Sequence, residues 1–579
     1  MENLDWIVLS CTLLFIVIYG ALKTKGSANV KDYLLDNNET PWFTVGLSVM
    51  ATQASAITFL STPGQAYHDG MGFVQFYFGL PLAMIVIAYT FIPIYHKLKV
   101  FTAYEYLEQR FDIRTRTLAS VLFLIQRGLG TGITIYAPSI ILSALLGWNL
   151  TMLNIIIGTL VIVYTVTGGT KAVNVTQKHQ MFVILLGMFI TFFLILDYLP
   201  EELDFGNVLH VAGANGKMNI LDFSYNPKTR YTFWSGITGG FFLMLSYFGT
   251  DQSQVGRYLS GKSVKESQMG LIMNGVLKVP MQFFILLTGV LVFVFFQFND
   301  APLHFNPNNV TKVKASTYKV DYEKIENKLQ LVNEEKKVVN KIYIEQLQHN
   351  DFDNPALRKQ MVALSLKEKE LREDAKDIIK KVDNGSETND KDYVFLYFIL
   401  HYLPKGLLGL LLAVIFSAAM SSSASGLNSL AATTAIDIYK RNVSEKSDKH
   451  YVYATQYFTL FWGIVAIGFA CISSLFENLI QLVNIIGSIF YGTVLGIFLV
   501  GFYIKYIRGN AIFIGACLSQ SIIFIIYYFY IHILPEDEKL SYLWLNFIGV
   551  VLTLFLSFFI QLLSKNNSNS NLNSKEELV

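Results

Sequence analysis

The chain has 579 residues, of which 53% are hydrophobic and 15% are charged, and its net charge is only +2. Soluble domains carry about a quarter charged residues, so this composition excludes a soluble multidomain protein. The apolar residues form blocks of about 20, the helix length that crosses a bilayer. Only closed hydrogen-bonding patterns survive in lipid. We therefore expect an all-α polytopic membrane protein, with the lipid bilayer as its surroundings.

The apolar blocks predict thirteen membrane spans. The first six lie at 4–23, 42–66, 72–97, 116–146, 150–168 and 175–199, and the other seven at 230–250, 268–298, 396–435, 451–476, 479–504, 510–533 and 541–563. The first block lacks the basic front end and the small-residue cleavage site of a secretory signal, so we expect it to be retained. All three cysteines fall within apolar spans, so no disulfide framework is expected.

The short loops between spans differ in their basic residues. One set is rich in Lys and Arg, including Lys97, Lys99, Arg110, Arg114, Arg116, Arg257, Lys262, Lys440 and Arg441. The intervening loops, such as 67–70 and 534–539, are poor in them. Because cytoplasmic loops carry an excess of Lys and Arg, we predict that the N-terminus is outside the cell membrane and the C-terminus is cytoplasmic.

Two polar segments interrupt the spans. Within the highly charged residues 300–393, apolar residues from Leu357 to Val382 recur at spacings of three, four and seven, and Ile325 to Val339 has the same rhythm. This spacing is typical of paired helices. We therefore divide the chain into a transmembrane part at 1–299, an extracytoplasmic helical hairpin at 300–393, a second transmembrane part at 394–564 and a disordered cytoplasmic tail at 565–579. The hairpin either binds a partner or is a solvated elaboration of a loop.

Polar residues inside membrane spans are costly and therefore point to function. The stretch FSAAMSSSASGLNSL, at 416–430, offers hydroxyl and carbonyl oxygens that suit a small alkali cation, although close helix packing favours the same small residues. The span at 42–66 mixes Thr52, Gln53 and Ser55 with Pro63 and Gly64. This mixture favours a broken helix whose unwound carbonyls bind an ion, over an intact polar helix in the bundle centre.

Two cationic residues lie well inside spans. Arg127 stands in LIQRGLGTGITIY and Lys278 in LIMNGVLKVP. Each is either a counter-charge for an anionic substrate or a structural residue paired with carbonyls or an acid. The glycines at 128, 130 and 132 permit close approach of a helix or a ligand to Arg127.

The rest of the chain offers little catalytic machinery. From its chemistry alone, the segment YFGTDQSQVGRYLSGKS, at 247–263, is a cytoplasmic loop. The sequence has no Walker-type phosphate loop, so coupling to ATP is not expected. It also has no metal-ligand cluster, no nucleophile triad and no nucleic-acid-binding patch, so we expect neither an enzyme nor a nucleic-acid partner.

Several segments together resemble the sodium/solute symporter family, which includes the sodium/glucose transporters. TDQSQVGRYLSGKS and SSSASGLNSLAATTAIDIYKR resemble its most specific signatures, while DYLLDNNETPWFTVGLS and GGTKAVNVTQKHQ resemble two of its loops. FTAYEYLEQRFDIRTRT and TGITIYAPSIIL look closest to the iodide, monocarboxylate and multivitamin branch. The resemblance implies a LeuT-like core of inverted five-plus-five helices, one extra helix before it and two after it, and alternating access around a midplane site.

The resemblance also implies a site for the coupling ion, sodium. Its ligands, carried over by position, are the carbonyls of Ala51, Ala54 and Ala418 and the hydroxyls of Ser421 and Ser422. Gln177 stands where family members often carry an aspartate, and Ala424, followed by Ser425, stands where some carry a serine. A second sodium site at Gln177 and Ser425 is therefore weak, and we expect one sodium per cycle.

The expected substrate-binding residues are Ser55, Thr58, Tyr77, Arg127, Tyr247 and Lys278. By resemblance, Tyr247 falls at the inner aromatic gate of the sugar transporters, and Lys278 matches a lysine near their sugar site. Met244 and Tyr77 replace an amide and a carboxylate of that site. We therefore expect symport of sodium with a small, anionic organic solute, such as a carboxylate, an acidic sugar or a vitamin-like molecule. A neutral sugar or polyol symporter and a non-transporting membrane sensor remain as alternatives.

Overall fold

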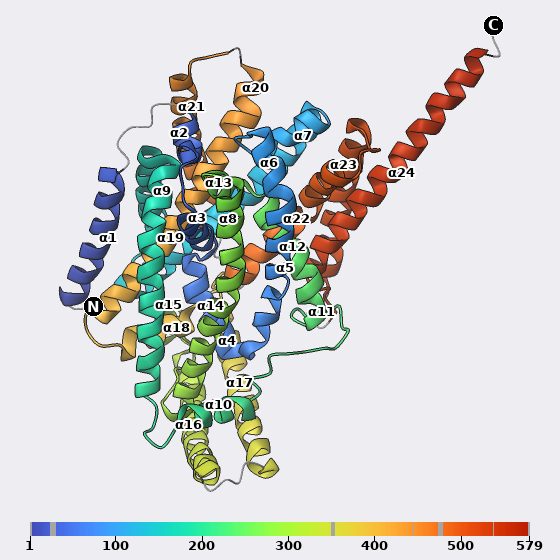
Figure 1. The fold of residues 1–579 in the computed structure, drawn as a ribbon. Helices are drawn as coiled ribbons and strands as arrows, with labels where there is room; N and C mark the ends of the chain where they lie inside the picture. Colours follow the sequence, from blue (N-terminus) through green and yellow to red (C-terminus); the bar gives the residue numbers. More distant parts are fainter. Residues whose placement is uncertain are drawn as a thin grey trace.

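The computed structural model describes residues 3–23, 30–348, 354–443, 445–472, 479–535 and 538–576. Within these ranges the chain is built of helices, and nine of the described helices are long and apolar enough to cross a membrane. Two shorter apolar helical stretches, Asn3–Phe15 and Leu150–Val163, accompany them. Figure 1 shows the long helices gathered into one bundle. The all-α polytopic class is therefore confirmed, while thirteen remains a prediction for the number of spans.

The core of the bundle consists of two helical repeats. The first comprises α3 (Trp42–Gln53), α4 (Ala56–Asp69), α5 (Leu80–Val86), α6 (Ile92–Leu98), α8 (Ile113–Leu146) and α9 (Leu150–Asp197). The second comprises α12 (Phe241–Thr250), α13 (Gln252–Leu259), α14 (Val264–Phe298), α19 (Leu407–Thr433), α21 (Asp448–Ile472) and α22 (Leu479–Tyr503). The helix α9 runs through the span predicted at 150–168 and most of the one predicted at 175–199, so these are one helical element rather than two.

Further helices flank this core. The helix α1 (Asn3–Lys23) precedes it, and α23 (Gly509–Tyr527) and α24 (Leu543–Glu576) follow it. The helix α24 continues through residues that the sequence predicts to be a disordered tail. The shorter helices are α2 (Val30–Leu35), α7 (Glu105–Arg110), α10 (Phe205–Ala214), α11 (Phe233–Ser235), α15 (Pro307–Lys314), α18 (Lys391–Tyr402) and α20 (Lys440–Asn442).

The apolar stripe of the charged segment produces two paired helices, α16 (Lys319–Gln348) and α17 (Pro355–Val382), which pack against each other. Their facing sides bury Leu329 and Val332 on α16 and Leu364 and Leu371 on α17. The pair projects from one end of the bundle, next to α10 (Figure 1). We call α16 and α17 the hairpin.

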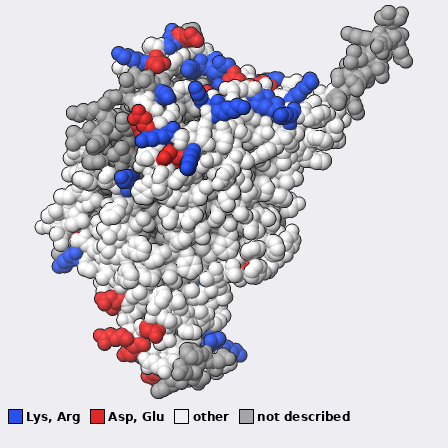
Figure 2. Space-filling model, in the orientation of Figure 1, with Lys and Arg blue, Asp and Glu red and all other residues white. Residues whose placement is uncertain are grey.

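Charged residues lie mainly at the two ends of the molecule, and the broad band between them is almost free of them in the view of Figure 2. Lys and Arg gather at the end opposite the hairpin, where α6 and α20 place Lys97, Lys440 and Arg441. An uncharged band between charged ends is what a bilayer-spanning protein requires.

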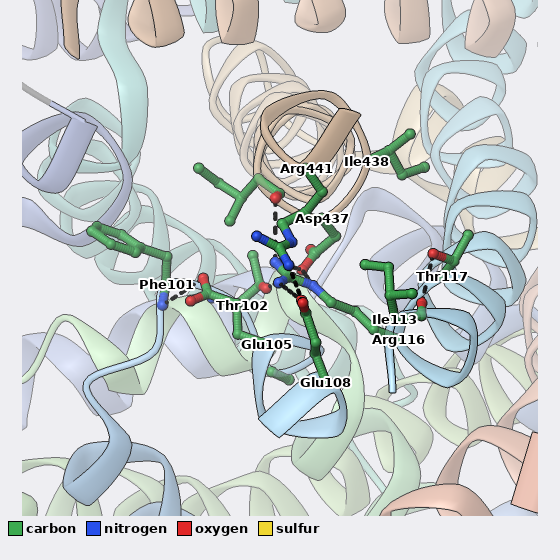
Figure 3. A network of polar contacts seen from close by, with 12 residues as sticks. Phe101, Thr102, Glu105, Glu108, Ile113, Arg116, Thr117, Asp437, Ile438 and Arg441 are labelled. Atoms are coloured by element: carbon green, nitrogen blue, oxygen red, sulfur yellow. Dashed lines mark hydrogen bonds and ion pairs between the residues drawn. The ribbon is translucent and has the colours of Figure 1, made fainter. Parts of the chain in front are cut away.

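A buried polar network joins two core helices at this basic end (Figure 3). The Arg116 guanidinium, on α8, donates to the Asp437 carboxylate at 2.8 Å and to Glu108 at 2.6 Å. The Thr102 hydroxyl donates to the same Asp437 oxygen at 2.7 Å, and Arg441 pairs with Glu108. Asp437 lies in the π-helical continuation of α19. The network therefore fixes the ends of α8 and α19, the helices that carry Arg127 and the serine-rich stretch.

Two core helices are broken midway, one in each repeat. Between α3 and α4, Ala54 and Ser55 leave the helical conformation. The break predicted in the second span is thereby confirmed, although Pro63 lies inside α4 rather than at the break. Between α12 and α13, Asp251 is extended, with φ −78° and ψ 119°. The prediction that 247–263 is a loop is wrong, because most of this stretch is the end of α12 and the buried helix α13.

Candidate functional site

The first break releases backbone carbonyls from their helical hydrogen bonds. In a continuous helix, the Ser55 and Thr58 amides would donate to the carbonyls of Ala51 and Ala54. Here the Ser55 amide donates to Gln53 at 3.0 Å, and the Thr58 amide donates to Ser55 at 2.9 Å. The carbonyls of Ala51 and Ala54 therefore lack the donors that a regular helix would supply.

The serine-rich stretch of α19 packs beside this break. The Ser422 hydroxyl donates to the Thr52 carbonyl at 3.4 Å. Ser421 is 1% exposed, and its hydroxyl has no hydrogen-bond partner among the described residues. Ala418 is buried one turn earlier on the same helix. Two freed carbonyls and an unpartnered buried hydroxyl are the neutral, hard oxygen donors that fit a sodium ion.

The side chain of Gln177 belongs to a hydrogen-bond network in which both its nitrogen and its oxygen have partners. Its amide nitrogen donates to the Thr52 hydroxyl at 3.1 Å and to the Ser425 hydroxyl at 2.9 Å. Its amide oxygen accepts from the Ser48 hydroxyl. The amide nitrogen thus bridges α3 and α19 by donating to a hydroxyl on each helix.

A cavity of about 100 Å³ opens beside the first break. It brings together five of the six predicted substrate residues, namely Ser55, Thr58, Tyr77, Arg127 and Tyr247, together with Ser422 of the predicted sodium site. Lys278 is not among the lining residues. It is fully buried in α14, and its amine has no partner among the described residues. The predicted substrate set is therefore assembled without Lys278.

Arg127 pairs with Asp251, the residue at the second break. The Arg127 side chain is 14% exposed, and its guanidinium lies 5.4 Å from the centre of the Tyr247 ring. Its Nε has no partner in the described part of the chain. Asp251 also accepts from the Tyr491 hydroxyl at 3.2 Å and from the Ser253 amide at 2.9 Å. One edge of the guanidinium is therefore held by Asp251, while Arg127 still lines the cavity.

The glycines beside Arg127 serve two purposes. A Cβ on Gly128 would lie 2.9 Å from Trp462 of α21, and one on Gly132 would lie 2.8 Å from Phe469. These two glycines allow close packing of α8 on α21. Gly130, by contrast, lines the cavity and has open space around its Cβ position.

Sequence reasoning missed several polar residues of the site, among them Gln126, Asp251, Asn484 and Tyr491. Asp251 carried a usable signal, since an acid followed by Ser253 after an apolar run is a helix N-cap pattern. Its side chain does cap α13. Gln126 and Tyr491 carried none on their own, because their mutual hydrogen bond of 3.1 Å joins α8 to α22.

Two broken helices, with free backbone oxygens at a break and a cavity beside it, are the arrangement of a secondary active transporter. The family model "Sodium:solute symporter family" matches residues 33–322 and 375–519. The chain belongs to this family. Residues 323–374, most of the hairpin, lie outside both matched segments.

Relatives and a solved structure agree with this assignment. The chain is 27% identical over 514 residues to "Sodium-coupled monocarboxylate transporter 1" of Xenopus laevis, covering 88% of this chain and 70% of that protein. It is 27% identical over 511 residues to "Sodium-dependent multivitamin transporter" of Oryctolagus cuniculus, covering 86% and 66%. It is 31% identical over 281 residues to the human "Sodium/iodide cotransporter", covering 48% and 43%. An outward-open Na⁺-coupled sialic acid symporter has the same fold, with a TM-score of 0.73, 23% identity and coverage of 97% and 98%.

The protein is therefore a multi-pass membrane transporter and not an enzyme. It couples solute movement to sodium, as the family and its relatives do. The predicted LeuT-like fold and family membership are confirmed. The family does not specify the solute, so the solute has to be inferred from the residues of the site.

Proposed function

We propose that this protein imports a small organic anion, a carboxylate, together with one sodium ion. The observation that carries the proposal is the position of Arg127, a cation on the wall of the cavity beside the first helix break. A buried arginine binds a carboxylate through parallel N–H groups, with both charge and geometry. Its unpartnered Nε is available for such a bond.

The size of the cavity supports a small solute. Its volume of about 100 Å³ is below the roughly 300–1,000 Å³ typical of sites for drug-sized ligands. Tyr77, Leu243 and Met244 supply apolar wall around the polar groups. A short carboxylate with an aliphatic part matches this lining, and relatives of the chain are named as carriers of monocarboxylates and of vitamins.

The sodium site proposed here consists of the carbonyls of Ala51, Ala54 and Ala418 and the hydroxyls of Ser421 and Ser422. A bound sodium ion would supply positive charge that holds α3, α4 and α19 together. Ser422 also lines the substrate cavity, so the two ligands share one residue. Each ligand then favours binding of the other, which is the reciprocal coupling that symport requires. Gln177 and Ser425 bind no second sodium ion, because the Gln177 amide already donates to the hydroxyls of Thr52 and Ser425.

We further propose that the basic end faces the cytoplasm and the hairpin faces the outside, with the N-terminus outside and the C-terminus inside. The gathering of Lys and Arg at the end opposite the hairpin supports this orientation (Figure 2). In Figure 1 the helix α24 runs toward the basic end, away from the hairpin.

Uptake into sodium-free proteoliposomes that are diluted into sodium-containing buffer tests the substrate class. We expect a sodium gradient to drive uptake of propionate or pyruvate and not of glucose, and Arg127→Ala to lower carboxylate uptake by about 100-fold, since it removes a buried ionic contact. Arg114→Ala is the matched control, because Arg114 lies on the same helix with a side chain that is 59% exposed. Unchanged carboxylate uptake in Arg127→Ala would show that the counter-charge assignment is wrong.

A further inference from the structure

A second and larger cavity, of about 450 Å³, lies under the hairpin. One wall is α17, which contributes Glu368, Arg372 and Lys376. The facing wall comes from the core, from the end of α4, from Lys217 and from the start of α18. This cavity shares no lining residue with the central one. Its volume falls within the range typical of ligand sites.

The facing wall is held in place by close backbone contacts. Gly70 has a φ of +74°, and a Cβ there would lie 2.6 Å from the Lys217 carbonyl. The Met71 amide donates to that same carbonyl at 2.8 Å. Across the cavity, the Ser365 hydroxyl of α17 donates to the Asn215 side chain at 2.9 Å. The hairpin and the core are therefore joined around a defined space.

The carboxylates that line this cavity are already paired. Glu368 binds Lys336 at 2.6 Å and Arg372 at 3.0 Å. Asp69 binds Lys391 at 2.7 Å, and Glu373 binds Lys376 at 2.8 Å. Asp390 accepts from the Phe305 amide at 2.8 Å. These acids therefore have little remaining capacity to attract a cation.

Two cations of the lining, the buried Arg372 and the half-buried Lys217, have donors that are not used in ion pairs or hydrogen bonds. Arg372 is 8% exposed and uses Nε for Glu368 and Nη1 for the Leu303 carbonyl, while its Nη2 has no partner within the described ranges. Lys217 donates to the His68 carbonyl at 2.6 Å and lies 4.6 Å from the centre of the Phe293 ring, but it forms no ion pair among the described residues. Desolvation lowers the pKa of Lys217 to about 8, although the nearby Asp69 and Glu368 act in the opposite direction.

The remaining lining is apolar and aromatic. Tyr67 packs edge-on against Phe293 and Phe305, and Val362 and Leu366 extend from the hairpin wall. An inorganic anion has no apolar surface to bury against these side chains, whereas the aliphatic part of an organic acid packs on them. A cavity with reserve cationic donors at one side and apolar groups at another matches an organic carboxylate.

We propose that the cavity under the hairpin is an outer binding site for a small organic carboxylate, held by Arg372 and Lys217. The site captures the anion before it reaches the central cavity, and this transport role rests on the function proposed above. Arg372 lies within 323–374, outside the segments matched by the family model. The hairpin therefore adds a substrate-capture site to a fold whose central site lies elsewhere.

Isothermal titration of the full-length, detergent-purified chain with propionate tests this site. Sodium-free buffer and the double substitution Arg127→Ala/Asp251→Ala silence the central cavity without leaving one of its charges unpaired. In this background we expect one propionate to bind per chain. Arg372→Gln and Lys217→Gln, on opposite walls, should each weaken binding by about tenfold or more, since each removes a charged hydrogen-bond donor.

Lys324→Gln is the matched control, because Lys324 is an exposed lysine on the hairpin that pairs with Asp321, and binding should not change. Circular dichroism of each variant checks that it is folded. No binding of propionate, or binding that survives both Arg372→Gln and Lys217→Gln, would overturn the site. Equal affinity for inorganic phosphate would overturn its assignment to organic carboxylates. If the central site transports another solute, uptake by the parent chain fails to prefer carboxylates while propionate binding under the hairpin persists.

Discussion

The two helix breaks use the same backbone device with opposite side-chain chemistry. Around the Ala54–Ser55 break, the groups at hand are neutral oxygens, the freed carbonyls and the hydroxyls of Ser421 and Ser422. At the other break, Asp251 is charged and pairs with Arg127. A broken helix offers unbonded polar groups near the midplane, and the side chains beside it decide which ligand those groups suit. Neutral oxygens suit a cation, and an arginine suits an anion.

The charged break carries a cost that the neutral break does not. Bringing Arg127 and Asp251 out of water is expensive, and a buried pair is weak evidence for stability. Removing one member is worse, because it leaves the other charge alone. We infer that Asp251 serves as the partner of Arg127 when no substrate is bound, and that a substrate carboxylate takes over part of this role.

The largest effect is expected when the charged break loses its acid. Asp251→Asn should lower the free energy of unfolding by about 3–5 kcal/mol, since the Arg127 charge is left buried and unpaired. Thermal unfolding in detergent measures this loss. Added propionate should raise the midpoint of Asp251→Asn more than that of the parent chain, because the ligand resupplies a carboxylate. Asp321→Asn, at an exposed hairpin position, is the control. An unchanged midpoint in Asp251→Asn would contradict the inferred role.

A smaller but still large effect is expected at the neutral break. Ser421→Ala and Ser422→Ala should each raise the sodium concentration for half-maximal uptake by about tenfold or more, because each removes an oxygen ligand of a charged group. Ser423→Ala is the neighbouring control, since its hydroxyl pairs with Thr134 at 2.7 Å. Sodium-dependent uptake of propionate is the measurement. Full sodium affinity in Ser422→Ala would exclude that hydroxyl from the ion site.

The contrast between the breaks also explains what the sequence could reveal. The first break was predictable because its polar residues interrupt an apolar span, which is costly unless they have a role. The second offered only the N-cap pattern at Asp251, because α12 ends there as it would at an ordinary span end. Only tertiary packing brings Arg127 to Asp251, 124 positions away in the chain.

Tertiary packing also explains why the sequence did not predict the position of Lys278 or the cavity under the hairpin. Resemblance placed Lys278 near the substrate, yet α14 packs closely on α3 and α4, and the lysine is buried away from the cavity lining. The helices of the hairpin followed from their apolar rhythm. The cavity beneath it did not, because its walls come from segments as far apart as Tyr67, Lys217 and Arg372.

The number of sodium ions per cycle tests whether Gln177 prevents a second sodium ion from binding near the Ala54–Ser55 break. Gln177→Asp replaces the two N–H donors between Thr52 and Ser425 by carboxylate oxygens, which attract a cation. We expect the Hill coefficient for sodium to rise from about one toward two, the value for two cooperating sites. Gln177→Asn, which keeps the amide, should stay near one. A coefficient near two in the parent chain would show that the single-sodium proposal is wrong.

The smallest effect is expected at Lys278, a cation that belongs to neither break. Its amine is fully buried without a partner among the described residues, and an unpaired buried amine costs free energy. Lys278→Met keeps the length of the side chain and removes this cost, so we expect a modest rise in the unfolding midpoint and carboxylate uptake within about twofold of the parent. Proteoliposome uptake and thermal unfolding measure the two quantities. A loss of uptake comparable to that of Arg127→Ala would return Lys278 to the substrate site and show that the solute has two counter-charges rather than one.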